Sequence, residues 1–243
     1  MSAAPLIEVK GLVCGYPGRD PVLRDLDLTL RPGQKAGLVG PNGCGKTTLL
    51  FAIMGLLTPQ AGEIRLFGTP MRSPKDFAAA RLRLGFLFQH ADDQLFSPTV
   101  LDDVAFGPLN QGLSRRDARK RAEETLDLLG LADFAQRTPY RLSGGEQKLA
   151  ALATILAMRP EVLILDEPTT GLDLATKARI VELLNGLDLA ILAVSHEPDF
   201  LSQITGSLFS LRHGRLRESA VAPHAHVHVH AEGDLPHSHD DEA

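Results

Sequence analysis

Three glycines, a lysine and a threonine stand in residues 40–47 at the spacing that binds phosphate groups. The segment reads GPNGCGKT, between an apolar run at 36–40 and a helix-like run at 48–54. Its glycines allow backbone N–H groups to turn toward an anion, and the following helix presents its positive end. Lys46 can then reach the β- and γ-phosphates of a nucleotide, and Thr47 can bind Mg²⁺. A simple glycine-rich turn is the alternative, but it would not need this full spacing. The residues expected to contact nucleotide here are Gly40, Asn42, Gly43, Cys44, Gly45, Lys46, Thr47 and Thr48.

Two adjacent carboxylates, Asp166 and Glu167, end an apolar run at 162–165. Sheets of parallel strands place ligand chemistry at strand ends of this kind. Asp166 can hold Mg²⁺ through its water shell, and Glu167 can orient or deprotonate the water that attacks a γ-phosphate. A polar pair that merely ends a strand before Pro168 is the alternative. The phosphate-binding pattern at 40–47 favours the catalytic interpretation.

A helix start with two consecutive glycines lies at 142–148, which reads LSGGEQK. Ser143 and Glu146 have the spacing of a helix capping box, and capping accounts for that pair. It does not account for Gly144 and Gly145, which weaken a helix but let N–H groups approach an anion closely. We therefore expect a second anion contact at this helix start.

The elements that must position these residues follow from hydrophobic periodicity. Alternating apolar and polar residues at 6–10 and 26–30 predict half-buried, antiparallel strands. Continuous apolar runs at 36–40, 162–165 and 190–194 predict parallel strands that are covered on both faces. Between these groups, residues 89–142 contain helix start and stop signals, with a serine before and a glycine after a charged run. We expect a mixed sheet, a buried α/β core and an inserted helical lobe.

The composition excludes several classes of protein. The 243 residues are 44% hydrophobic, which suffices for one large domain or for two lobes that share an interface. No apolar run approaches the ~18 residues of a membrane-spanning helix, and residues 1–5 lack the basic and apolar regions of a secretion signal. The two cysteines, Cys14 and Cys44, predict reduced thiols and no disulfide framework. We expect a cytoplasmic protein.

The formal net charge of −5 lies in residues 220–243, which hold five acidic side chains and no lysine or arginine. The rest of the chain has 25 acidic and 25 basic side chains, so its body is neutral. A basic cluster at 115–121 is followed by two glutamates and is interpreted as a solvated helix face. Charge therefore gives no reason to expect nucleic acid as a partner.

Together, these motifs resemble those of the ATP-binding subunits of ABC transporters, over nearly all of residues 5–218. In that family the LSGG segment is the signature sequence, which closes over the ATP held by another subunit. The resemblance implies that Tyr16 stacks on adenine and that Gln89 touches Mg²⁺ and a membrane partner. It also implies that Asp173, in a GLD segment, lies in a loop that crosses the dimer interface. His196 corresponds to the histidine that contacts the γ-phosphate.

The resemblance also implies the fold and the assembly. The fold is a P-loop NTPase core, a mixed sheet with a parallel centre, together with an N-terminal antiparallel β subdomain and a helical subdomain inserted at about 90–158. Two subunits, expected to be two copies of this chain, clamp two ATP molecules with Mg²⁺. Lys46 and Thr47 of one subunit then lie opposite Ser143 and Gly145 of the other. Many relatives have glutamine where this chain has Glu146, and glutamate is compatible with the same capping role.

Two further segments indicate a type of transporter. Residues 88–96, FQHADDQLF, and 99–108, TVLDDVAFGP, resemble the ATPases of energy-coupling-factor importers, the cobalt and nickel group in particular. This implies a motor for nickel or cobalt uptake on the cytoplasmic face of the membrane, with a transmembrane coupling protein and a substrate-binding membrane component. An importer of vitamins or another metal is one alternative. The other is a soluble ABC ATPase that acts in iron–sulfur cluster assembly or on nucleic acids. The single nucleotide-binding domain and the absence of net charge before the tail disfavour it.

Residues 219–243 form a tail rich in His, Asp and Glu, which we expect to be disordered. Imidazole suits Ni²⁺, Co²⁺, Zn²⁺ and Cu²⁺, and alternate residues of an extended chain face the same side. A weak metal-collecting tail is the functional interpretation, and a solvated, pH-sensitive tail is the alternative. The histidines concerned are His224, His226, His228, His230, His237 and His239.

Overall fold

The computed structural model describes residues 4–220, so the six histidines of the predicted metal-binding tail lie outside the described part of the chain. The strands are β1 (Ile7–Cys14), β2 (Leu23–Leu30), β3 (Lys35–Val39), β4 (Ala61–Leu66), β5 (Thr69–Pro70), β6 (Leu84–Leu87), β7 (Val162–Asp166), β8 (Ala190–Val194), β9 (Ser207–Arg212) and β10 (Arg215–Ala220). The α-helices are α1 (Lys46–Ile53), α2 (Pro74–Arg81), α3 (Val100–Asn110), α4 (Arg115–Leu128), α5 (Gly144–Leu156), α6 (Leu174–Gly186) and α7 (Pro198–Ile204). Short 3-10 helices are η1 (Ala91–Asp93), η2 (Ala132–Phe134) and η3 (Pro139–Arg141).

The larger sheet has the strand order β10-β9-β3-β8-β7-β6. Its five strands from β9 to β6 run parallel, and only the edge strand β10 is antiparallel to its neighbour. Every residue of β6, β7 and β8 is buried, as expected for parallel strands covered on both faces. The strands predicted at 36–40, 162–165 and 190–194 are therefore confirmed as β3, β7 and β8.

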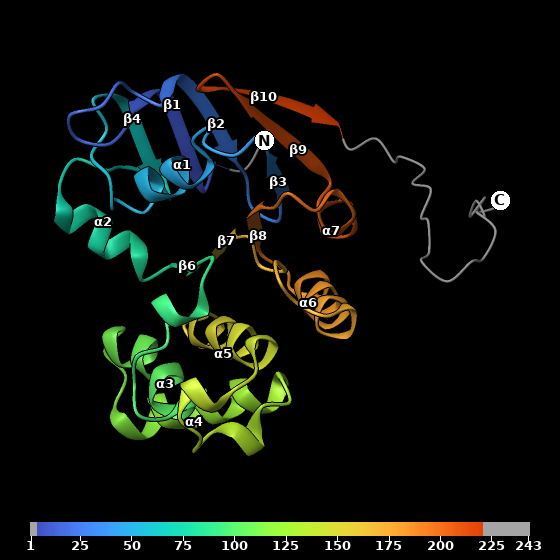
Figure 1. The fold of residues 1–243 in the computed structure, drawn as a ribbon. Coiled ribbons are helices and arrows are strands. Elements are labelled where there is room, and N and C mark those ends of the chain that lie inside the picture. Colours follow the sequence, from blue (N-terminus) through green and yellow to red (C-terminus); the bar gives the residue numbers. More distant parts are fainter. Residues whose placement is uncertain (1–3, 221–243) are drawn as a thin grey trace, which may run out of the picture.

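The smaller sheet is antiparallel, with the order β2-β1-β4-β5. Ile7 of β1 lies opposite Leu30 of β2, and the two strands alternate buried and more exposed residues along much of their length. This pattern places one face of the sheet on the core and leaves the other toward solvent. The smaller sheet lies in the upper part of the molecule in Figure 1, where β10 of the larger sheet also packs against β2.

A helical lobe made by α3, α4 and α5 lies on the other side of the larger sheet from β1, β2 and β4 (Figure 1). Helix α3 packs against both α4 and α5, and α5 reaches back to β6. Helix α4 begins after Ser114, whose side chain accepts a hydrogen bond from the N–H of Asp117, and it ends before Gly130, whose φ is 56°. Both positions agree with the helix signals in the sequence. The buried Leu126 belongs to the apolar cluster between this lobe and the sheet.

Strand β10 runs to Ala220, so its last two residues fall in the segment that the sequence assigned to the tail. The antiparallel pairing with β9 continues to the pair Ala220 and Ser207.

Candidate nucleotide-binding site

The predicted phosphate loop joins the end of β3 to the start of α1, as its spacing requires. Gly43 and Gly45 have φ values of 77° and 108°, a backbone region that favours glycine. At Gly45 space also matters, because a Cβ atom would stand 2.7 Å from Leu23 Cδ2 and 2.9 Å from Val22 Cγ1. The loop can adopt this turn only with glycine at that position.

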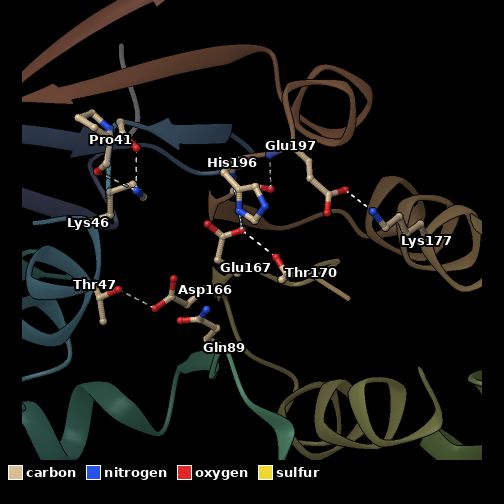
Figure 2. A network of polar contacts seen from close by, with 12 residues as sticks. Pro41, Lys46, Thr47, Gln89, Asp166, Glu167, Thr170, Lys177, His196 and Glu197 are labelled. Carbon is tan, nitrogen blue, oxygen red and sulfur yellow. Dashed lines mark hydrogen bonds and ion pairs between the residues drawn. The ribbon is translucent and has the colours of Figure 1, made fainter. Parts of the chain in front are cut away.

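Lys46, the first residue of α1, is 9% exposed and turns its ammonium group into the loop. Its Nζ donates to the carbonyl oxygens of Gly40 at 2.7 Å and Pro41 at 3.2 Å, as Figure 2 shows for Pro41. A cation enclosed by backbone groups at a helix N-terminus is suited to phosphate oxygens.

Thr47 and Asp166 meet although 119 positions separate them in the sequence. The Thr47 hydroxyl donates to Asp166 Oδ2 at 3.1 Å (Figure 2). Burial raises the pKa of Asp166; the charge of Glu167 adds to the rise, while the hydrogen bond from Thr47 and the charges of Lys46 and Lys148 oppose it. A hydroxyl oxygen beside a carboxylate oxygen is the kind of hard donor pair that Mg²⁺ prefers, so these residues fit that ion.

Glu167 is 7% exposed and has a φ of 50°, which is uncommon for a residue with a side chain. Its Oε2 lies 2.8 Å from His196 Nδ1 and accepts a hydrogen bond from the Thr170 hydroxyl at 3.1 Å (Figure 2). The backbone N–H of Glu167 donates to Val194 O at 2.9 Å, which anchors the turn to β8. Surrounding contacts thus hold the carboxylate in one position at the end of β7.

One cavity of about 620 Å³ brings most of the predicted nucleotide contacts together. The predicted site residues that line it are Tyr16, Asn42, Gly43, Gly45, Lys46, Thr47, Thr48, Gln89, Asp166, Glu167 and His196. Tyr16 is 39% exposed at its edge, where an aromatic ring is accessible to a planar ligand. Gly40 and Cys44 instead line a neighbouring cavity of about 990 Å³ on the phosphate loop, together with exposed Arg24 and Arg212.

The remaining predicted residues do not line the 620 Å³ cavity of their own chain. Ser143 begins α5 with the expected capping box, because its hydroxyl accepts from the N–H of Glu146 at 3.3 Å and Glu146 Oε2 accepts from the N–H of Ser143 at 2.7 Å. Gly144 and Gly145 follow in the first turn, and Asp173 caps α6 by accepting from the N–H of Thr176 at 2.9 Å. These four predicted contacts therefore lie outside that cavity.

Sequence reasoning missed four residues in or near the site. Arg19, Asp20 and Val22 line the cavity from the loop between β1 and β2, and nothing in their spacing marks them. Lys148 lies inside the protein on α5, at 4% exposure, and burial lowers its pKa while the charges of Asp166 and Glu167 oppose this. The signal that could have identified Lys148 is the presence of a lysine within an alanine- and leucine-rich helix.

Residues 4–220 contain no helix that is long and apolar enough to cross a membrane. In the same part of the chain, no group of three or more His, Cys, Asp or Glu side chains could hold a metal ion.

Residues 23–170 match the family model described as ABC transporter. The chain is 47% identical to a putative ABC transporter ATP-binding protein of Nitratidesulfovibrio vulgaris, across 97% of this chain and 86% of that one. It is 43% identical to the cobalt import ATP-binding protein CbiO of Rhodobacter capsulatus, across 90% of this chain and 80% of that one.

Solved structures show the same similarity. CbiO1 of Clostridium perfringens, part of the transporter complex CbiONQ, superposes with a TM-score of 0.79 at 31% identity, covering 89% of each chain. The ATP-binding cassette MJ0796, in a dimeric post-hydrolysis state bound to ADP and Pi, superposes with a TM-score of 0.80 at 27% identity, covering 90% of this chain and all of that one.

Proposed function

This chain belongs to the ABC transporter family as an ATP-binding and ATP-hydrolysing subunit, and we propose that it energises the uptake of nickel or cobalt through a multi-subunit membrane transporter. The observation that carries the ATPase chemistry is the convergence of Thr47, Asp166, Glu167 and His196 on one cavity beside the phosphate loop. The choice of a metal cargo rests on the similarity to a relative whose name includes cobalt import and on the importer-like segment 88–96.

In this proposal the phosphate loop binds the triphosphate and the carboxylates handle Mg²⁺ and water. Lys46 and the loop N–H groups neutralise phosphate charge, and Tyr16 stacks on the adenine. Thr47 and Asp166 would hold Mg²⁺, with Gln89 beside them, and the bound ion would neutralise phosphate charge.

Glu167 is the proposed general base for the attacking water. Its carboxylate faces the cavity and is oriented by Thr170 and His196, as a base that must act at one position requires. His196 has 58% of its side chain exposed, so its ring can also reach a γ-phosphate beside Glu167.

A second subunit is proposed to complete each nucleotide site. Ser143, Gly144 and Gly145 lie outside the cavity of their own chain. Apart from its chain neighbours and the backbone of its own helix, no heavy atom lies within 4 Å of the point where a Cβ on Gly144 would stand. Apolar side chains near these motifs face solvent, since Tyr140 is 73% and Leu174 is 84% exposed. Open backbone donors between exposed apolar side chains suit a surface that closes on another copy of this chain.

The membrane partners are proposed to dock near the Gln89 segment. Phe96 and Phe106 are 68% and 46% exposed and form an edge-to-face pair with ring centroids 5.0 Å apart. An exposed aromatic pair on the helical lobe can receive an apolar segment of a transmembrane coupling protein. The chain would then lie peripherally on the cytoplasmic face of the membrane, with the substrate-binding component carried by the coupling protein.

Importers of vitamins or of another metal use the same kind of motor, so the cargo needs a direct test. Cells expressing the intact transport system would carry wild-type chain, Glu167→Gln, the control Glu182→Gln on the exposed face of α6, or a truncation after Ala222. We expect nickel or cobalt, measured by elemental analysis together with zinc and copper, to rise with wild type and with Glu182→Gln but not with Glu167→Gln. A lower rise with the truncated chain would assign a role to the tail histidines. Unchanged metal content in every strain would contradict the metal cargo and favour a vitamin.

A further inference from the structure

Lys148 is a charged residue inside the protein that none of the roles above uses. It lies on α5, five positions after Ser143, and is 4% exposed. Burying an ammonium group is costly unless it is paired or hydrogen-bonded, and apolar packing alone would be served better by leucine or methionine. The contacts of Lys148 therefore call for a specific explanation.

The ammonium group of Lys148 binds the backbone of the segment that carries Gln89. Its Nζ donates to Gln89 O at 2.5 Å and to Phe88 O at 3.3 Å. These two residues directly follow β6, at the edge of the cavity that Gln89 lines. The charges of Asp166 and Glu167, at the end of the neighbouring strand β7, also act on the ammonium. Lys148 thus holds the Gln89 backbone close to the two carboxylates.

A second side chain connects the same segment to the same helix. Gln94 Nε2 donates to Ala151 O at 2.8 Å and to Thr154 Oγ1 at 2.7 Å, while its Oε1 accepts from the N–H of Phe88 at 3.3 Å. The three α5 positions involved, 148, 151 and 154, are spaced by three and lie along one side of the helix. One face of α5 therefore binds both ends of the segment 88–94.

We propose that Lys148 is a positioning residue that fixes the Gln89 segment to α5. The helix that begins with Ser143 and the two glycines then also determines where Gln89 stands relative to Asp166 and Glu167. Ser143 and Lys148 are only about 7 Å apart along the helix axis, so a shift of the helix start on engaging another subunit's nucleotide moves Gln89 with it. This inference rests on the proposed function, because it assumes that Gln89 acts on Mg²⁺ in its own site and that Ser143 acts on the partner's ATP.

The test compares Lys148→Met with a chemically matched lysine away from the site. Lys35 also donates from Nζ to two backbone carbonyls, Leu184 O at 2.8 Å and Asn185 O at 3.1 Å, and it lines neither cavity at the phosphate loop. The purified full-length chains would be wild type, Lys148→Met, Lys35→Met, Gln89→Ala and the double variant Lys148→Met/Gln89→Ala. The measurements are kcat, KM for ATP, the Mg²⁺ concentration for half-maximal activity, and equilibrium binding of a fluorescent ATP analogue with and without Mg²⁺.

We expect Lys148→Met to lower kcat at least tenfold while KM for ATP changes less than threefold, because the phosphate loop is untouched. The gain in analogue affinity on adding Mg²⁺ should shrink by the same factor in Lys148→Met and Gln89→Ala. In the Gln89→Ala background, Lys148→Met should change kcat less than twofold, as expected for a residue that acts through another. Lys35→Met should keep kcat within twofold of wild type.

Three results would overturn the proposal. The losses from Lys148→Met and Gln89→Ala could multiply in the double variant, Lys35→Met could lower kcat as much as Lys148→Met, or Lys148→Met could leave kcat unchanged. Should Lys148→Met not fold, Lys148→Gln takes its place, since its amide can still donate to one carbonyl and should give a smaller loss with the same non-additivity. Glu167→Gln is measured alongside: full ATPase activity in that variant would refute the assigned base without bearing on Lys148.

Discussion

Replacing Asp103 tests how the loop that presents Phe96 is held. Asp103 is 2% exposed on α3, and its Oδ1 accepts from the backbone N–H of Phe96 at 3.1 Å and of Ser97 at 2.9 Å. Its Oδ2 is buried without a hydrogen-bond partner among the described residues. Oδ1 therefore holds the loop through two hydrogen bonds, while burial of the unpaired Oδ2 lowers the stability of the folded protein.

The size of the effect follows from these contacts. Two hydrogen bonds to a charged acceptor contribute about 1.5–3 kcal/mol each, and removing the buried, unpaired oxygen returns about 1–3 kcal/mol. Asp103→Ala should therefore lower the free energy of unfolding by about 2–3 kcal/mol. Asp103→Asn can keep both bonds through its carbonyl oxygen and should lose about 1 kcal/mol or less. For a chain of this size, the larger loss corresponds to a fall in Tm of roughly 4–12 °C.

Urea unfolding followed by circular dichroism would measure the free energies of unfolding of wild type and both variants. Binding to the proposed membrane coupling protein in a capture assay would show whether Phe96 is still presented. Asp103→Ala should weaken capture, and Asp103→Asn should retain it, because the loop stays in place. If the free energies of unfolding of the two variants agreed within about 0.5 kcal/mol, the assignment of both bonds to Oδ1 would be refuted. A difference that small is typical of surface substitutions that remove no specific contact.

Further expectations concern the phosphate loop and the start of α5. Lys46→Met should weaken binding of a fluorescent ATP analogue at least tenfold with little change in Tm, since it removes the cation beside Gly40 O and Pro41 O; unchanged affinity would contradict its role. A bulky maleimide on Cys44 should block analogue binding, and saturating ATP should protect the thiol; equal inactivation with and without ATP would count against this. Glu146 accepts a hydrogen bond from the N–H of Ser143, which holds the pKa of its carboxyl below the ordinary value of 4.5. Its stabilisation of α5 is complete above about pH 4.5 and is lost as the pH falls through the lowered pKa, so Glu146→Gln should flatten that part of the stability curve measured by urea unfolding.

The sequence by itself determined the features whose cause lies within a few residues. The phosphate loop needs glycines and a following helix, and both occur within 40–54. The cap at Ser143 and the helix end before Gly130 are also local, because a side chain or a left-handed glycine satisfies backbone groups of the adjacent turn. Strand β8 and the first four residues of β7 are apolar because both faces of these strands are covered.

The tertiary structure decided which of these local features meet. Strand β3 lies beside β8 and β9, and β7 lies between β8 and β6, an order that no local pattern specifies. That order brings Thr47 to Asp166 across 119 positions and Lys148 to the Gln89 backbone across 59. In the same arrangement, Ser143 lies outside the cavity of its own chain. Hydrophobic periodicity and helix caps indicate which face of each element is buried and where the element ends. The partner of a side chain depends instead on how all elements pack around the shared core.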